Sequence, residues 1–240
     1  MRMNFVIDTH THTISSGHAY STLTEMVNAA RERGLEAIAI TDHGDAIPGG
    51  ANFIHFSNLR VVPRTINGVE VLRGAEVNIV SLDGDVDLEN RVLKELDIVI
   101  ASFHEPCIAP GTMEENTRCL LKVMENPYIH IIGHPGNPAF PIDIPRVVAK
   151  AKEEQVLIEV NDSSIRPTSF RKGSRERCLE IARECQKQGV TIAVGSDAHI
   201  HYDVGKFDSA RKLVEEAEVD LRLIANTSVE KLKERLRKPL

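Results

Sequence analysis

Short apolar runs alternate with longer amphipathic segments along nearly the whole chain. Seven of the runs are at most seven residues long and rich in Ile and Val, which predicts buried parallel strands. The predicted strands are Asn4–Asp8, Glu36–Thr41, Val71–Val77, Asp97–Ser102, Ile129–Gly133, Val156–Val160 and Thr191–Gly195.

The segments between these runs carry apolar residues at helical spacing. In the first of them, Thr22 and Glu25 have the spacing of a capping box, and Gly34 suits the position just after a helix. The predicted helices occupy residues 21–34, 112–126, 143–155, 174–189, 207–218 and 228–240. Regular alternation of strand and helix predicts a parallel α/β sheet, although the spacing alone does not decide whether the sheet is open or closed.

Histidines and acids follow the strands at their carboxyl ends, which is the edge where parallel α/β folds bind ligands. They are His10 and His12 after the first predicted strand, His43 after the second, Glu76 in the third, His104 after the fourth, His134 after the fifth, and Asp197 and His199 after the seventh. His18 lies in the loop behind the first pair. Only a barrel-like closure brings the end of the first strand near the end of the seventh, so this polar pattern favours a closed barrel.

These nine side chains predict a metal centre. Side chains alternate along a strand, so His10 and His12 share one face and can hold one ion, while His18 can reach a second. Taken singly, each motif could be a polar turn or half of an ion pair, but together they are hard to attribute to chance. Imidazoles and carboxylates without thiolates suit zinc, manganese or iron. Nine candidates exceed one tetrahedral ion and suffice for two or three if one carboxylate bridges.

The remaining histidines and the cysteines are assigned to packing. His55 lies in a long loop and His130 inside a strand, whereas His201 could share a face with His199 and contact substrate. The cysteines form no C-x-x-C pair, which favours packed thiols in a reduced, cytoplasmic protein; they are Cys107, Cys119, Cys178 and Cys185.

Length and charge narrow the function classes. A chain of 240 residues suits one large domain, here residues 1–240. A net charge of −6 gives no support for nucleic-acid binding. No apolar run approaches the roughly 18 residues of a membrane span, and the first residues do not resemble a secretory signal. We therefore expect a small-molecule partner, and self-association into a homo-oligomer stays open.

At this point the motifs themselves resemble a known family. "DTHTH", "TDHG", "GAE", "SFHEP", "GHPGNP" and "GSDAH" occur in the order found in the polymerase and histidinol phosphatase (PHP) superfamily. "HAYSTL" and "GHPGNP" are similar to the YcdX-like phosphatases within it. The resemblance implies a distorted (β/α)7 barrel with a metal site at the C-terminal rim of the strands. It also implies three ions, typically zinc, and hydrolysis of phosphate esters.

The resemblance further implies how the ligands are shared. The first ion would take His10, His12, Glu76 and Asp197; the second His18, His43 and His199; and the third Glu76, His104 and His134, with Glu76 bridging. The expected activity is hydrolysis of small phosphate monoesters by a metal-bound hydroxide, with Glu76 and Asp197 as the catalytic carboxylates. One departure is "NDSS" after the sixth strand, where relatives often have a second Asn, and it concerns local hydrogen bonding.

Several other polar residues are each compatible with two roles. Asp42 and Glu105 could each donate a proton to the leaving group or orient the neighbouring imidazole, and we favour orientation. The basic segment 163–177 could capture a substrate anion or be a solvated loop; it holds Arg166, Arg171, Lys172, Arg175 and Arg177. An amidohydrolase or deacetylase would use similar ligands, and a metal-stabilised, non-catalytic accessory module is a third class.

Overall fold

Seven parallel strands follow one another in chain order, in the computed structural model, which describes residues 3–236. Their order is β1-β2-β4-β5-β6-β7-β8, and all seven predicted strands are confirmed, several in shorter form. The bounds are β1 Ile7–Asp8, β2 Ala37–Ile40, β4 Val69–Asn78, β5 Ile98–Ser102, β6 Ile131–Ile132, β7 Leu157–Asn161 and β8 Ile192–Gly195.

One further strand was not predicted. β3 (Thr65–Ile66) pairs antiparallel with the start of β4, with Ile66 opposite Val69. The two-residue turn between them is Asn67-Gly68, and both residues have positive φ, 52° and 84°. Asn-Gly is the strongest short hairpin signal, but a strand of two residues has too few positions to show alternation.

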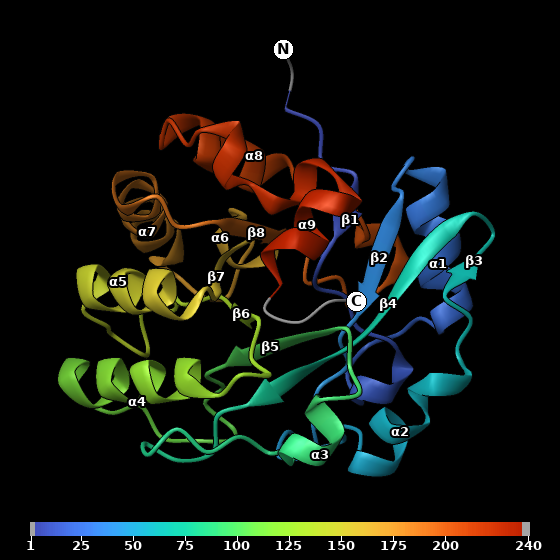
Figure 1. The fold of residues 1–240 in the computed structure, drawn as a ribbon, viewed down its shortest axis with the longest axis horizontal. Coiled ribbons are helices and arrows are strands. Elements are labelled where there is room, and N and C mark those ends of the chain that lie inside the picture. The colour runs from blue at the N-terminus through green and yellow to red at the C-terminus, as the bar shows by residue number, and fades with distance from the viewer. Residues whose placement is uncertain (1–2, 237–240) are drawn as a thin grey trace.

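The six predicted helices form, and they surround the strands (Figure 1). They are α1 Leu23–Glu32, α4 Met113–Glu125, α5 Ile144–Glu154, α7 Ser174–Gln188, α8 Asp208–Glu216 and α9 Val229–Arg235. The capping box of Thr22 with Glu25 is present at the start of α1. Residues 237–240 of the last predicted helix lie outside the described residues.

The short helices in the connections were not predicted, because each has too few turns to show the helical spacing of apolar residues. They are α2 Phe53–Asn58, α3 Asn90–Leu93 and α6 Asp162–Ile165, together with the 3-10 turns η1 Ile14–Ser16, η2 Leu59–Val61, η3 His201–Asp203, η4 Leu221–Leu223 and η5 Ala225–Thr227. Among residues 3–236, no helix is long and apolar enough to cross a membrane.

The sheet closes between its first and last strands, so the predicted distorted (β/α)7 barrel is confirmed. Beyond the ends of β1 and β8, the His12 amide donates to the Ala198 carbonyl and the Asp197 amide to the His10 carbonyl, both at 2.9 Å. Within the strands, the Asn226 side chain spans the gap: its Nδ2 donates to the Ile7 carbonyl at 2.9 Å, and its Oδ1 accepts from the Val194 amide at 2.7 Å. These backbone groups between β1 and β8 therefore have hydrogen-bond partners, although the two strands do not form a continuous ladder of hydrogen bonds.

The two ends of the barrel interior differ in character. Away from the carboxyl ends of the strands, the interior is filled by the buried side chains of Ile7, Leu72, Ile98, Ile100 and Leu157. Val229 and Leu232 of α9 belong to the same apolar cluster. A second apolar cluster lies between the outside of the sheet and the helices. Apolar packing thus fills one end, and the polar residues gather at the other end, where the strands finish.

Candidate metal centre

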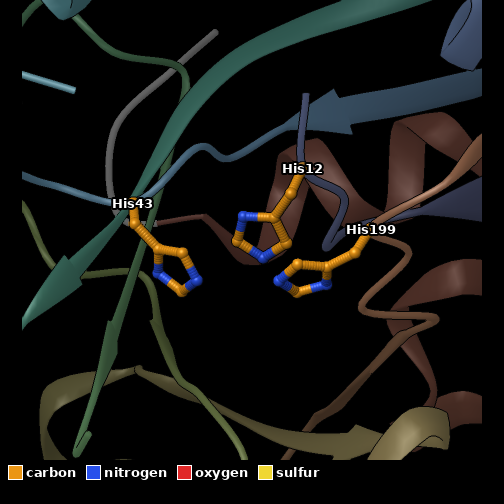
Figure 2. Close-up of side chains that lie close together, drawn as sticks. All are labelled: His12, His43 and His199. Carbon is orange, nitrogen blue, oxygen red and sulfur yellow. The ribbon is translucent and has the colours of Figure 1, made fainter. Parts of the chain in front are cut away.

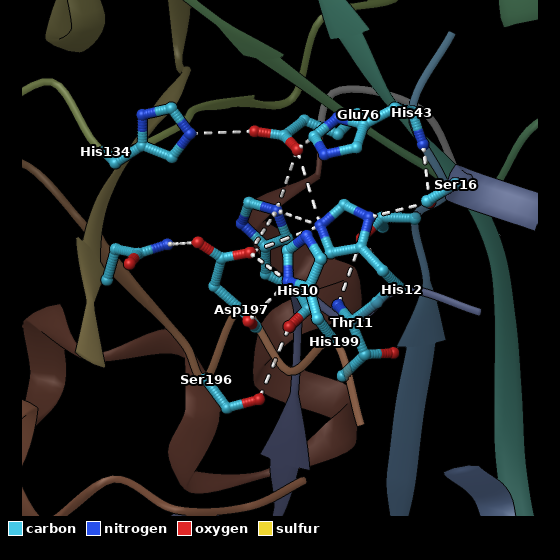
Figure 3. A network of polar contacts seen from close by, with 12 residues as sticks. His10, Thr11, His12, Ser16, His43, Glu76, His134, Ser196, Asp197 and His199 are labelled. Atoms are coloured by element: carbon cyan, nitrogen blue, oxygen red, sulfur yellow. Dashed lines mark hydrogen bonds and ion pairs between the residues drawn. The ribbon is translucent and has the colours of Figure 1, made fainter. Parts of the chain in front are cut away.

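Glu76, near the end of β4, lies at the centre of the polar cluster (Figure 3). It is 0% exposed, and its two oxygens face different histidines. Oε2 is 3.2 Å from His10 Nε2 and 2.9 Å from His43 Nδ1. Oε1 is 2.9 Å from His134 Nε2 and 3.4 Å from His104 Nε2. One carboxylate therefore connects two separate sets of imidazoles.

Four donor atoms on one side of Glu76 have the spacing of a tetrahedral metal site. His10 Nε2 lies 3.0 Å from His12 Nε2 and 3.7 Å from Asp197 Oδ1. His12 Nε2 lies 3.3 Å from Asp197 Oδ1 and 3.4 Å from Glu76 Oε2. Ligands at the usual zinc distances of about 2.0–2.1 Å, arranged tetrahedrally, are roughly 3.3–3.4 Å apart. The separations of His10, His12 and Asp197 from one another and of Glu76 from the two histidines, 3.0 to 3.7 Å, lie around this value.

Hydrogen bonds behind the rings determine which nitrogen of each histidine faces the centre. His10 Nδ1 lies 2.7 Å from Glu159 Oε1, an acceptor, so Nδ1 carries a hydrogen and Nε2 is the nitrogen that faces the centre. His104 Nδ1 likewise donates to Asn78 Oδ1 at 2.8 Å. Metal-binding histidines typically donate their second nitrogen in this way.

Ser16, which is held by Asp42, orients the His12 ring so that its Nε2 faces the centre. The Ser16 hydroxyl donates to Asp42 Oδ1 at 2.7 Å, so its oxygen is left to accept from His12 Nδ1 and from the His43 amide, both at 3.1 Å. Asp42 also accepts from the Thr13 amide at 2.7 Å. Asp42 is 1% exposed and does not line the cavity over the centre, which agrees with an orienting role rather than proton donation.

A third set of histidines lies on the outer side of the cluster. Nε2 of His18 and Nε2 of His199 are 2.9 Å apart, and His199 Nδ1 donates to the Asp197 carbonyl at 3.0 Å. His12, His43 and His199 converge closely enough to hold one ion (Figure 2). His43 also groups with Glu76 and His104, so it lies between the outer set and the carboxylate.

The electrostatics of the cluster demand positive charge. Glu76, Asp197 and Glu159 are 0%, 8% and 1% exposed. Burial raises the pKa of Glu76, but interactions with His10 and neighbouring imidazoles outweigh burial and hold the pKa well below its usual range. The pKa of Asp197 is likewise held low, against burial, by His10 and neighbouring histidines. These carboxylates therefore depend on nearby positive charge: Glu159, Glu76 and Asp197 outweigh burial and hold the pKa of His10 well above its usual range, and bound divalent ions would supply such charge in its place.

Glu159 on β7 is the main functional residue that the sequence patterns did not reveal. Its Oε1 accepts from His10, and its Oε2 accepts from the His134 amide at 2.7 Å and from Asn161 Nδ2 at 3.2 Å. Asn161 Nδ2 also donates to Asp197 Oδ2 at 3.2 Å. The available signal was an acid inside the otherwise apolar run "VLIEV", where a barrel interior leaves no access to water.

The backbone is unusual at two of the candidate ligands. His134 and Asp197 have positive φ, 29° and 55°, a conformation that is uncommon outside glycine. Beside them, Gly195 cannot be replaced without collision, because a Cβ there would lie 2.3 Å from Glu159 Oε1 and 2.5 Å from His10 Cβ. Such outliers gather at sites where the surroundings hold a functional geometry.

A cavity of about 750 Å³ opens over the centre. Seven of the nine predicted ligands line it, namely His18, His43, Glu76, His104, His134, Asp197 and His199. Arg171 is the member of the basic segment that lines the cavity; its Nη1 donates to Ser164 Oγ at 2.7 Å and lies 3.6 Å from Asp197 Oδ2. Arg166 is instead held by Asp162 at 2.7 Å and Asp203 at 2.9 Å.

The remaining candidates lie outside the cluster or at its edge. His201 Nδ1 is 2.9 Å from Ser21 Oγ, His55 is 3.5 Å from Asp42, and His130 Nδ1 accepts from the Val99 amide at 3.0 Å. Glu105 is exposed and lines the cavity. No cysteine belongs to a potential metal-binding group in the described chain. Burial raises the pKa of the Cys119 and Cys178 thiols to about 12, as expected of packed thiols.

Comparisons with known proteins place the chain in a family. The PHP domain matches residues 8–163. A protein of Acetivibrio thermocellus named "probable phosphatase" is 51% identical over 236 residues, which cover 98% of this chain and 97% of that protein. A probable phosphatase of Clostridium novyi is 48% identical over 230 residues, covering 96% of this chain and 93% of that protein.

Two solved structures share the fold. The histidinol phosphate phosphatase of Lactococcus lactis subsp. lactis, in complex with zinc, L-histidinol and phosphate, has a TM-score of 0.60 and 17% identity, covering 89% of this chain and 94% of that one. A histidinol phosphatase of Listeria monocytogenes, itself described as putative, has a TM-score of 0.62 and 17% identity, covering 85% of this chain and 99% of that one. With the domain match and close relatives spanning almost its whole length, the chain belongs to the PHP domain family.

Proposed function

We propose that this protein is a metal-dependent phosphatase that hydrolyses small phosphate monoesters at a centre of three divalent ions, with zinc as the expected metal and manganese or iron as alternatives. The names of its relatives and the zinc and phosphate in the Lactococcus lactis enzyme support the activity. The observation that carries the proposal is Glu76, whose two oxygens face separate sets of imidazole nitrogens. A bridging carboxylate offsets the repulsion between neighbouring cations.

We propose the ligand sets implied by the family, although the side chains of the described structure group His12, in place of His18, with His43 and His199, and His43, in place of His134, with Glu76 and His104. The first would be His10, His12, Glu76 and Asp197; the second His18, His43 and His199; and the third Glu76, His104 and His134. When bound, the ions supply charge for the phosphoryl oxygens and an activated water. Glu76 and Asp197 carry the negative charge that holds the ions, and Glu159, Asn78 and Ser16 keep the imidazoles in the binding tautomer.

Two further groups can act on the substrate directly. Arg171 faces the centre from the cavity wall and can neutralise a phosphoryl oxygen. Glu105 lines the same cavity and is the candidate for proton transfer to a leaving alkoxide, since Asp42 does not line it and Asp203 is paired with Arg166 and Lys206.

The proposal is tested by metal analysis together with an activity screen. We expect more than one transition metal ion per chain, hydrolysis of p-nitrophenyl phosphate, loss of activity with a chelator, and recovery with zinc or manganese. Full activity in metal-free protein would contradict the mechanism. Hydrolysis of an acylated amine such as an N-acetyl amino acid, with no release of phosphate from esters, would support the amidohydrolase alternative instead.

Arg171→Ala should raise KM more than it lowers kcat, because the lost charge binds the phosphate of substrate and transition state alike. Arg171→Lys should retain part of the effect, although Lys lacks the bidentate geometry. Lys172→Ala, at the exposed neighbouring position, is the matched control and should leave KM unchanged. If Arg171→Ala and the control have equal kinetics with several phosphate esters, the basic segment does not bind the substrate and is a solvated loop.

A further inference from the structure

We infer that the substrate's alcohol is apolar and not anionic, and preferably aromatic, because the cavity offers it an apolar wall. This inference rests on the proposed phosphatase function and adds the class of leaving group. The wall consists of Ile47, Pro48, Phe103, Pro106, Phe170 and Ile200. They lie in the segments after β2, β5, β7 and β8, so apolar surface surrounds the polar floor on several sides. A cavity of about 750 Å³ also has far more room than a phosphate group needs.

Phe170 is the exposed aromatic residue of this wall. Its side chain is 78% exposed, an arrangement that leaves a large apolar surface in contact with water until something covers it. The guanidinium carbon of Arg171 lies 5.0 Å from the centre of its ring. Arg171 is itself tied to Ser164, so the ring is held beside the group that faces the metal centre. An aromatic alcohol on a bound phosphate would contact this ring.

The charges around the cavity argue against an anionic or highly polar alcohol. Asp203 is already paired with Arg166 at 2.9 Å and with Lys206 at 2.8 Å. Glu105 is exposed at the wall and would repel a second phosphate or a carboxylate. Arg171 faces the centre, where it serves the phosphoryl group. The wall therefore offers an alcohol apolar contact, and Arg171 is the one arginine or lysine among the described residues that line the cavity.

The reaction breaks the P–O bond to the alcohol, forms a bond from a water oxygen to phosphorus, and releases the alcohol and inorganic phosphate. Benzyl phosphate and glycerol 1-phosphate are both esters of primary alcohols, so a difference between them reports mainly on binding of the alcohol. For zinc-loaded protein we expect kcat/KM for benzyl phosphate to exceed that for glycerol 1-phosphate by about tenfold or more.

Phe170→Ala should lower this ratio by about threefold or more, whereas Phe170→Tyr should preserve it. The matched control is Phe53→Ala. Phe53 also lies under an arginine, with the Arg91 guanidinium carbon 5.2 Å from its ring centre, but it does not line the cavity. Metal content should be unchanged in all three variants. A general loss of phosphate binding through Arg171 would reduce both esters equally and leave the ratio intact.

The outcomes separate this inference from the proposed function. If both esters are hydrolysed with equal kcat/KM, or if Phe170→Ala leaves the ratio unchanged, the apolar-alcohol inference is wrong and the phosphatase stands. If zinc-loaded protein hydrolyses neither ester nor p-nitrophenyl phosphate, the proposed function itself fails.

Discussion

Glu76→Gln should weaken two ions together and lower hydrolysis by on the order of 10²-fold or more. The substitution keeps the shape of the side chain but replaces one anionic oxygen by an amide that cannot bind a cation. In the protein, Oε2 faces His10 and His43 at 3.2 and 2.9 Å, and Oε1 faces His134 at 2.9 Å. Whichever way the amide turns, one set of imidazoles loses its shared oxygen, and the remaining cations lose the charge between them.

The measurement is metal stoichiometry per chain, alongside the rate of p-nitrophenyl phosphate hydrolysis and circular dichroism to confirm folding. His134→Ala is the comparison, because it removes a ligand from one side of Glu76 only and should weaken one ion. Full metal content with near-normal activity in Glu76→Gln would show that Glu76 does not bridge, and the three-ion assignment would fail.

Glu159→Gln should weaken metal affinity by about 10- to 100-fold, although Glu159 is not itself a proposed ligand. All three of its partners are donors: His10 Nδ1, the His134 amide and Asn161 Nδ2. A glutamine has one acceptor oxygen and cannot satisfy both sides. If its amide turns toward His10, that imidazole must accept at Nδ1 and carry its hydrogen on Nε2, which removes the lone pair offered to the ion. If it turns toward His134, a buried N–H loses its acceptor.

A matched control separates this effect from the general cost of removing a buried carboxylate. Asp97 is 5% exposed and accepts from the Arg73 amide at 2.8 Å, but it precedes β5 and so lies at the opposite end of the barrel. Asp97→Asn should lower the free energy of unfolding and leave metal stoichiometry unchanged. If Glu159→Gln behaves in the same way, its role is structural and the tautomer argument is wrong.

Local patterns were sufficient for the elements that are long enough to repeat. The helices α1 and α4 both begin with a capping box, and in α1 the sequence motif of Thr22 and Glu25 marked it directly. The parallel strands were visible because burial on both faces requires continuous apolar runs. The hairpin of β3 and the short helices α2, α3 and α6 carry too few residues for any period, and long-range packing determines them.

The nine candidate ligands were also visible in the sequence, because strand ends in a parallel sheet meet at one rim and eight of the nine lie at or just after the end of a strand, with His18 in the loop behind His10 and His12. Their chemistry is intrinsic to the residue: an imidazole or carboxylate is unusual at the end of a buried strand unless something binds it. The proposed sharing of these ligands among three ions comes from the family motifs, because spacing along the chain does not contain it.

Only the tertiary structure decided which groups support the ligands and which face the substrate. Glu159 lies 149 residues from His10 in the chain and yet fixes its tautomer. Among the basic residues of segment 163–177, Arg171 lines the cavity while Arg166 is neutralised by Asp162 and Asp203. Hydrogen-bond partners and side-chain directions depend on distances across the closed barrel. Closure of the barrel brings together residues that lie far apart in the sequence, and nothing in the sequence indicates that they are in contact.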